Sequence, residues 1–437
     1  MSLLLLLVLG CTPKDGPADS PADSADDPTT DCVRPEQTSP DVVFVVVDTL
    51  RADHLPPYGY PRDTAPHFSA WAEDAALFEQ AVSQGGWTVP AVSAMLTGLY
   101  PSSTGGLSGT IHDGFDLMAE RFQSAGYLTA ALTKSSVYSA AAGYAQGFET
   151  FTFIQGDHRS GRSAEELSDA ALAWLEAEAC VDAPRFLFLH YLDPHVAYEA
   201  PEPWLERFDE GGSDVCGDEQ TIWSYQSGEA TPSEADLARL VALYDGEIAW
   251  WDEQLGRLLA ALPEGTAVIV AGDHGEQFLD HGGWVHEDLW QENLHVPLAI
   301  QWPGAAPRRV SGRVQTADLL PTLAGLLGWP PDARWQGRDL SGVVAGDEEP
   351  PSATIYSQYN ERSAVIDEAG WKLIRERDGD PSQDRLYDLS ADPGEREDRS
   401  ADAPEALARL RGLAETLRDE SAAILAAMES TDEAQRR

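Results

Sequence analysis

Basic residues are scarce in this sequence of 437 residues. It contains 29 lysines and arginines against 74 aspartates and glutamates, for a formal net charge of −45 at pH 7, and only three of the basic residues are lysines. Such a charge repels nucleic acids and anionic membrane surfaces, so no nucleic-acid partner is expected. An anionic substrate would have to be captured by a local positive charge, which a bound metal ion can supply.

The sequence also lacks an uninterrupted apolar run of the ~20 residues that span a membrane, which excludes a polytopic membrane protein. Leu3–Gly10 is a short Leu/Val run typical of a secretion signal, and Val8-Leu9-Gly10-Cys11 resembles a bacterial lipobox, whose cysteine becomes lipidated. Residues 1–11 are therefore predicted to be a signal peptide and lipobox. We expect a periplasmic or surface lipoprotein of the bacterial cell envelope, touching the membrane only through a lipid anchor at Cys11. Plain secretion is the alternative.

Cysteines are few: Cys11, Cys32, Cys180 and Cys216. With Cys11 lipidated, three remain, and an oxidising envelope makes a Cys180–Cys216 disulfide plausible, with three unpaired thiols as the alternative. Residues 12–39 are rich in Pro, Asp, Ser and Thr and have almost no large apolar side chains. Such a segment buries too little apolar surface to offset the entropy lost on folding, so it is predicted to be a disordered linker.

Beyond the linker, the apolar pattern predicts an α/β fold. Continuous apolar runs, typical of strands buried on both faces of a parallel sheet, occur at residues 41–48, 185–190, 266–272 and 296–301, and the first of them is rich in β-branched residues. Helical patterns lie between them, at residues 65–78, 90–96, 115–125, 164–179 and 233–262. A mainly parallel sheet covered by helices on both faces is therefore expected over residues 40–348. Residues 349–437 are predicted to form a small α+β subdomain. It has short strands at 354–358, 364–366 and 371–376 and a helix from Pro404.

Polar side chains follow three of the predicted strands, where ligands bind in open α/β sheets. Asp48 ends the first strand, His190 ends the second and is followed by His195, and Asp273-His274 ends the third. Six of the ten histidines fall between residues 190 and 295. Each acid alone could be a helix N-cap, but together these residues favour a metal or oxyanion site.

Thr88 is the candidate nucleophile. It stands two residues before Pro90, which suits the first turn of a helix, and Gly98 is placed to end that helix. A hydroxyl there would face unsatisfied backbone N–H groups and the positive end of a helix dipole. A threonine hydroxyl is a poor nucleophile unless a cation lowers its pKa, so a simple capping role is the alternative.

An ordered series of motifs carries a family resemblance. DVVFVVVDTLRADHLPPYGYPRDTAPHF and SQGGWTVPAVSAMLTGLYP are followed by HYLDPHVAYEAP, GDHGEQFLDHGGWVHEDLWQENLHVPLAIQWPG, VQTADLLPTLAGLLG, QGRDL and GWKLIRERDGDPSQDRLYDLSADPGE. In order and spacing this resembles the sulfatase family of the alkaline phosphatase superfamily, from about residue 40 to 400. The resemblance implies an alkaline-phosphatase-like core with a small C-terminal subdomain.

The resemblance also implies roles for individual residues. Asp48, Thr88, Asp273 and His274 match the metal-binding positions, with Thr88 as the catalytic residue. His195 and His286 match histidines that contact the ester oxygens or protonate the leaving group. Lys134 matches an oxyanion-binding lysine, or is a surface lysine; Arg51 is an ion-pair partner behind the site, or a solvated arginine.

Two departures from the sulfatase pattern affect the chemistry. The usual nucleophile is a Cys or Ser matured to formylglycine within C/S-x-P-x-R, but here the motif is Thr88-Val89-Pro90-Ala91-Val92, and threonine cannot form formylglycine. Thr49 replaces the second acid of the common Asp-Asp pair. The resulting set resembles phosphate-transferring branches of the superfamily, which use a threonine nucleophile on manganese. One divalent ion is expected, Mn, Zn or Ca, with Mn or Zn favoured by a histidine ligand.

The sequence thus predicts a sulfatase-like, metal-dependent hydrolase of sulfate or phosphate esters that acts through a metal-activated Thr88. The substrate would be a small-molecule, glycan or lipid ester. A phosphodiesterase or a phosphoglycerol or phosphoethanolamine transferase is one alternative. A degenerate family member that serves as a surface binding protein is another.

Overall fold

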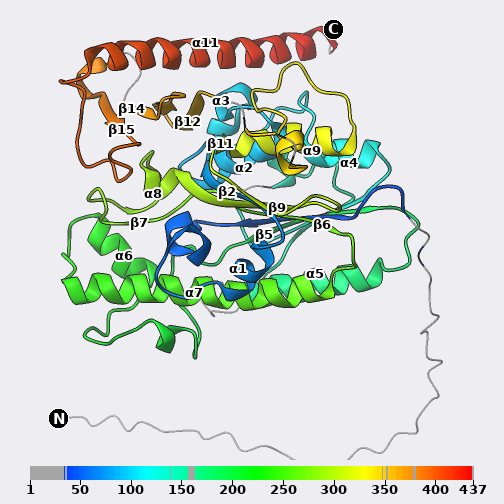
Figure 1. Ribbon diagram of the computed structural model, residues 1–437, viewed down its shortest axis with the longest axis horizontal. Coiled ribbons are helices and arrows are strands. Elements are labelled where there is room, and N and C mark those ends of the chain that lie inside the picture. The colour runs from blue at the N-terminus through cyan, green and yellow to red at the C-terminus, as the bar shows by residue number, and fades with distance from the viewer. Residues whose placement is uncertain are drawn as a thin grey trace, which may run out of the picture.

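The computed structural model describes residue 34 and residues 37–137, 139–155, 163–346, 348–350, 353–376 and 380–435, with side chains to residue 430 (Figure 1). The predicted signal peptide, Cys11 and most of the predicted linker lie outside these residues. No helix in the described part of the chain is both long and apolar enough to cross a membrane.

A nine-stranded sheet forms the centre of the molecule. Its strands are β1 (Val42–Val47), β2 (Ala76–Val82), β3 (Leu128–Thr133), β4 (Thr150–Phe153), β5 (Arg185–Tyr191), β6 (Ala267–Gly272), β9 (His295–Gln301), β10 (Arg308–Val310) and β11 (Val314–Gln315). They follow the order β10-β2-β9-β6-β1-β5-β3-β4, and β11 also pairs with β2. Every pairing is parallel except those of β9, which runs antiparallel to both β2 and β6. The expected mainly parallel α/β sheet is confirmed, whereas the expectation that residues 296–301 form a parallel strand was wrong.

Helices cover both faces of this sheet, as Figure 1 shows. The bounds are α1 (Pro66–Ala72), α2 (Thr88–Thr97), α3 (Pro101–Thr104), α4 (Met118–Ser124), α5 (Ser163–Ala177), α6 (Glu219–Gln226), α7 (Glu234–Ala261), α8 (Gln291–Leu294), α9 (Leu319–Leu327) and α10 (Ser341–Val344). Alternate residues of β1 enter opposite cores. Val43 packs in the core that includes residues of α1, α5 and α7, and Phe44 in the core that includes residues of α2, α4 and α9. Burial on both faces explains the unbroken apolar run of β1.

The predicted helix over residues 65–78 was wrong in its second half. Helix α1 ends at Ala72, and β2 begins at Ala76 and pairs with β9. A short apolar run such as Ala75–Phe78 fits a buried strand or a buried helix equally well by periodicity, and only its sheet partners decide. The other predicted helices overlap α2, α4, α5 and α7.

The C-terminal subdomain is a four-stranded antiparallel sheet under a long helix. Its strands are β12 (Ile355–Tyr359), β13 (Arg362–Ile366), β14 (Trp371–Arg375) and β15 (Arg385–Asp388), and the helix is α11 (Pro404–Gln435). In Figure 1 this helix lies on the far side of the small sheet from the main one. Strand β12 also contacts the segment before α2, because Gln358 donates its backbone N–H to the carbonyl of Gln84 at 2.9 Å.

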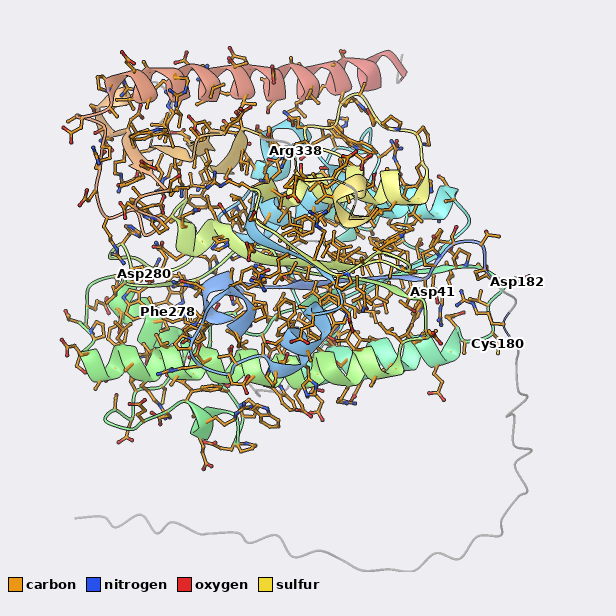
Figure 2. The ribbon with its side chains drawn as sticks, in the orientation of Figure 1. Asp41, Cys180, Asp182, Phe278, Asp280 and Arg338 are labelled. Atoms are coloured by element: carbon orange, nitrogen blue, oxygen red, sulfur yellow. The ribbon has the colours of Figure 1, made fainter. Side chains whose placement is uncertain are left out.

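The cysteines differ from expectation. Cys180 is disulfide-bonded, but Cys216 is free and exposed, so the expected Cys180–Cys216 bond was wrong. Cys180 precedes β5 and Asp41 precedes β1, and Figure 2 labels both on the side of the molecule away from Phe278 and Asp280, which follow β6. The disulfide therefore lies toward the amino ends of the strands, and the candidate site residues follow their carboxyl ends.

Candidate active site

The candidate site forms where β1, β2, β5 and β6 end at one edge of the sheet. Asp48 follows β1, His190 is the penultimate residue of β5, and Asp273 and His274 follow β6. Thr88 is the first residue of α2 and comes six residues after the end of β2. The parallel strands therefore bring together side chains that are separated by up to 226 positions in the sequence.

Asp48, Asp273 and His274 form a tight buried cluster whose candidate ligand atoms all lie within 4.8 Å of one another. The Nε2 atom of His274 lies 3.4 Å from Oδ1 of Asp48 and 3.5 Å from Oδ2 of Asp273. Among the described residues, neither of these two carboxylate oxygens has a hydrogen-bond partner. Unpartnered carboxylate oxygens cost free energy in a protein interior, and a cation bound between them would remove that cost. The donor set therefore fits a divalent metal ion.

Thr88 lies directly against this cluster. Its Oγ1 is 3.4 Å from Oδ2 of Asp48 and 3.3 Å from Nε2 of His274, and the side chain is 4 % exposed. Helix α2 ends at Gly98, as expected, with a φ of 68° that suits glycine. The hydroxyl stands at the amino end of a ten-residue helix, where the dipole favours negative charge.

The loop before Thr88 is held by close backbone contacts. The carbonyl of Gly86 accepts a hydrogen bond from the N–H of Glu287 at 2.7 Å. A Cβ atom on Gly86 would lie 2.0 Å from the carbonyl oxygen of Asp288, so only glycine fits there. Residues 285–288 therefore fix the approach of the Thr88 loop to the site.

His190 also faces the cluster. The sequence placed it among the residues at this end of the sheet but assigned it no individual role. Its Nε2 lies 3.6 Å from Oδ2 of Asp273 and 3.9 Å from Oδ2 of Asp48, and the ring is fully buried. Strand β5 pairs with β1 in the register Val46↔His190, which places the ring beside the end of β1. In the sequence, His190 is recognisable as a histidine at the end of a buried apolar run. The order of the strands in the sheet decides which residues such a histidine faces.

The electrostatics of the cluster follow from burial and from like charges. Burial, with the nearby Asp273 and Glu276 carboxylates, raises the pKa of Asp48 well above its usual value. Burial also acts to raise the pKa of Asp273, but His274 and His190 hold it below its usual value. Two buried carboxylates that share a site cannot both ionise easily without a positive charge between them.

His195 and His286, predicted as catalytic histidines, lie beside the cluster. The ring of His286 is 4.8 Å from that of His274 and 5.0 Å from that of His195, measured between centroids. Nδ1 of His286 lies 3.1 Å from Oε1 of Glu276, an interaction that sets the orientation and tautomer of the ring. Burial lowers the pKa of each imidazole to about 4 and raises that of the Glu276 carboxyl to about 7.

Four of the six histidines between residues 190 and 295 thus converge, and two do not. His281 contacts Glu292 at 2.6 Å, and His295 lies 2.9 Å from the backbone carbonyl of Glu79. Clustering along the sequence therefore identified the region, but it did not separate the histidines at the site from the structural ones.

Lys134 and Arg51 are both buried and ion-paired. The Nζ atom of Lys134 lies 2.6 Å from Oε2 of Glu166 on α5, and the side chain is almost fully buried, so the alternative of a surface lysine was wrong. Its role toward an oxyanion stays a prediction. Arg51 contacts Asp53 at 2.8 Å and Asp280 at 3.0 Å, which excludes a solvated arginine. It also donates to the carbonyl of Glu276 at 3.0 Å and so supports the loop after β6.

A cavity of about 470 Å³ opens beside His286. Besides His286, its wall includes Tyr225 from α6, Trp284 and Glu287 from the loop after β6, and Tyr359 from the end of β12. The C-terminal subdomain therefore forms part of the wall. A small molecule bound in the cavity would contact His286.

Comparison with known proteins places this geometry in context. The sulfatase family model matches residues 40–329. The ulvan-active sulfatase of Formosa agariphila is 26% identical over 346 residues, a match that covers 71% of this chain and 66% of that protein. The phosphonate monoester hydrolase of Agrobacterium radiobacter has a similar fold, with a TM-score of 0.71 and 23% identity over 89% of this chain and 96% of that one. A protein solved with its substrate D-glucosamine-2-N,6-O-disulfate is also similar, with a TM-score of 0.71 and 18% identity over 87% and 98% of the two chains.

Proposed function

The chain belongs to the sulfatase family, and we propose that it hydrolyses sulfate or phosphate esters with Thr88 as the nucleophile and a divalent metal ion at Asp48, Asp273 and His274. One observation carries this proposal: the Thr88 hydroxyl lies 3.4 Å from Oδ2 of the buried Asp48, whose other carboxylate oxygen has no hydrogen-bond partner among the described residues. Without a bound ion, the buried carboxylates would destabilise the fold and would have no chemical role.

Asp48, Asp273, His274 and the Thr88 hydroxyl would hold the metal ion, and His190 is close enough to join them. When bound, a divalent ion lowers the pKa of a neighbouring hydroxyl and draws electron density from an ester oxygen. Imidazole beside carboxylates suits Mn or Zn better than Ca, which prefers a shell of oxygen ligands.

The protein's own residues account for the rest of the reaction. Thr88 Oγ1 loses its proton to water and bonds to sulfur or phosphorus, while the bond from that atom to the leaving alcohol breaks. His195 and His286 lie where they can give a proton to the departing oxygen, because binding of an anionic ester beside them raises the pKa of an imidazole. Water then hydrolyses the ester of Thr88 and releases the inorganic anion. The amino end of α2 stabilises the negative charge that develops in both steps.

Phosphate esters or phosphodiesters are the second candidate substrates. Threonine at position 88 supports them, since it cannot become formylglycine, and the phosphonate monoester hydrolase of similar fold acts on a phosphorus ester. Group transfer to an alcohol in place of water is the transferase alternative. A surface binding protein without catalysis is the third possibility, and it requires no metal at the site.

The test is a substrate panel with and without added metal. Purified protein, first stripped with a chelator, is assayed with p-nitrophenyl sulfate, phosphate and phosphodiester in the presence of Mn, Zn or Ca. We expect turnover that depends on Mn or Zn, and we expect Thr88→Ala to lose at least about a thousandfold in kcat while metal stays bound. Full activity of Thr88→Ala would refute the nucleophile, and absence of any metal uptake would favour the binding protein.

We further propose that the protein is a lipoprotein of the bacterial cell envelope, anchored at Cys11. The apolar run before Cys11 supports this, and the disulfide-bonded state of Cys180 suits an oxidising compartment. Labelled palmitate should enter the wild type and not Cys11→Ser. Equal recovery of the two forms in the soluble fraction would indicate plain secretion.

A further inference from the structure

The cavity beside His286 is the place where the alcohol part of an ester would lie. Glu287 is fixed close to the nucleophile loop, because its N–H donates to the carbonyl of Gly86, two residues before Thr88. The same cavity is lined by His286, which the proposed function makes a proton donor. A group bound through its sulfur or phosphorus at Thr88 would therefore extend its alcohol toward Glu287.

The charge of this cavity is negative. Among the described residues that line it, Glu287 and Asp288 are acidic, and none is lysine or arginine. The nearest guanidinium, that of Arg362, pairs with Asp288 and with Glu376 and so is already used. Glu287 itself accepts a hydrogen bond from the neutral hydroxyl of Tyr359 at 2.8 Å. Its carboxylate is exposed and has no ion-pair partner among the described side chains.

Aromatic rings complete the wall. Tyr225 and Trp284 stack with centroids 5.4 Å apart, and Tyr359 stands beside Glu287. Aromatic faces next to a carboxylate attract cations, through the ring quadrupole and the negative charge together. A leaving group with its own sulfate or carboxylate would meet Glu287 with no lysine or arginine in the wall to offset the repulsion.

We propose that the preferred substrate is an ester of an amino alcohol, whose positively charged amino group binds between Glu287 and the aromatic wall. This inference rests on the proposed function and specifies its substrate class. It excludes polyanionic sugars, such as multiply sulfated glycans, as preferred substrates.

The test uses three small esters that differ in the charge of one end group, which is positive, neutral or negative. The 2-aminoethyl, 2-hydroxyethyl and carboxymethyl esters of sulfate, and the same three of phosphate, are compared by kcat/KM with the metal-loaded full-length protein. We expect the aminoethyl ester to exceed the carboxymethyl ester by at least about tenfold, as an ion pair at a partly exposed site allows. Glu287→Gln should reduce this ratio at least threefold. The matched control Glu264→Gln makes the same charge change at the opposite end of β6 and should leave the ratio unchanged.

A binding measurement separates this inference from the proposed function. The same esters are titrated into metal-loaded Thr88→Ala by calorimetry, which needs no turnover. If the wild type cleaves no ester, including p-nitrophenyl esters, the proposed function fails, and the order of affinities still decides the inference. The inferred substrate class would be overturned if the carboxymethyl ester were cleaved or bound as well as the aminoethyl ester, or better. It would also be overturned if Glu287→Gln left the ratio of kcat/KM for these two esters unchanged.

Discussion

At the scale of single residues, the site depends on carboxylate side chains whose burial without a partner is energetically unfavourable. Asp48 and Asp273 place unpartnered carboxylate oxygens in the interior, and their closeness raises the pKa of Asp48. A bound cation would convert this repulsion into attraction, so metal binding should also stabilise the fold. His190 contributes to the same balance from the neighbouring strand.

His190→Ala should weaken metal binding by about 10- to 100-fold, because the ring lies within 4 Å of both carboxylates and either binds the ion or orients its ligands. The measurement is the dissociation constant for Mn or Zn by calorimetry, together with the rise in melting temperature on adding metal. His295→Ala is the control, since its ring contacts the carbonyl of Glu79 away from the cluster. Equal affinities in the two variants would exclude a role for His190 at the metal.

The sequence was sufficient to select Asp48, Thr88, Asp273 and His274 as one candidate group. Each belongs to a local motif that follows a strand or begins a helix, and the family resemblance supplied their order. His190 was different, because its part in the site depends on the register between β1 and β5. The sequence places His190 at the end of a strand, but it does not show which residues a non-local pairing brings beside that strand end.

At the scale of elements, loop packing positions Thr88. The 83–87 segment lies between residues 285–288 on one side and the end of β12 on the other. Strand β2 leads into this segment, and its first three residues were predicted to be the end of a helix, since residues 75–78 are apolar without a clear period. The Thr88 motif was therefore recognised while the strand that carries it was missed.

Gly86→Ala should reduce kcat by about a hundredfold and leave the protein folded. The new methyl group would overlap the Asp288 carbonyl, so the loop must shift, and displacements near 1 Å carry a cost of this size. Activity is measured beside circular dichroism and metal affinity, with Gly304→Ala in an open surface turn as the control for a glycine substitution. Wild-type kcat in Gly86→Ala would show that the loop tolerates movement.

A buried ion pair holds the C-terminal subdomain together. Lys372 on β14 contacts Glu395 at 2.6 Å with both side chains fully buried, and the N–H of Gln291 in the main domain also donates to Glu395. Nearby, Nε2 of His281 lies 3.1 Å from the backbone carbonyl of Glu395. These contacts connect the subdomain to the loop that carries His286.

Lys372→Met should destabilise the protein by about 3–5 kcal/mol, because it leaves the Glu395 carboxylate buried without its partner. The double variant with Lys372→Met and Glu395→Gln should recover much of the lost stability, because both buried charges are then removed. Chemical denaturation gives both values. A loss below 1 kcal/mol in the single variant would mean that water reaches Glu395.

At the scale of the whole molecule, the net charge of −45 dominates. Like charges on a folded surface repel one another and oppose the approach of anionic esters, and salt screens both effects. Composition predicted a small C-terminal subdomain, and the separate antiparallel sheet of β12–β15 confirms its presence. The seating of β12 against the nucleophile loop was not predicted, because it joins segments more than 250 residues apart.

Raising NaCl from about 0.05 to 0.5 M should increase the melting temperature by about 2 °C or more, since the Debye length falls well below the spacing of most surface charges. Differential scanning calorimetry measures this, and sucrose of equal osmolarity serves as the control. A melting temperature that stays constant or falls with NaCl would show that surface repulsion contributes little to stability.

The reversed strand β9 has a consequence for how this site can change. It stands between β2 and β6, so Thr88 follows a strand that touches neither β6, which leads to Asp273, nor β1, which leads to Asp48. The separations are two and three strand spacings of about 4.8 Å each. A change at position 88 therefore need not disturb the anchoring of the carboxylates. The sheet thus separates the residue proposed to attack the ester from the residues proposed to hold the metal ion.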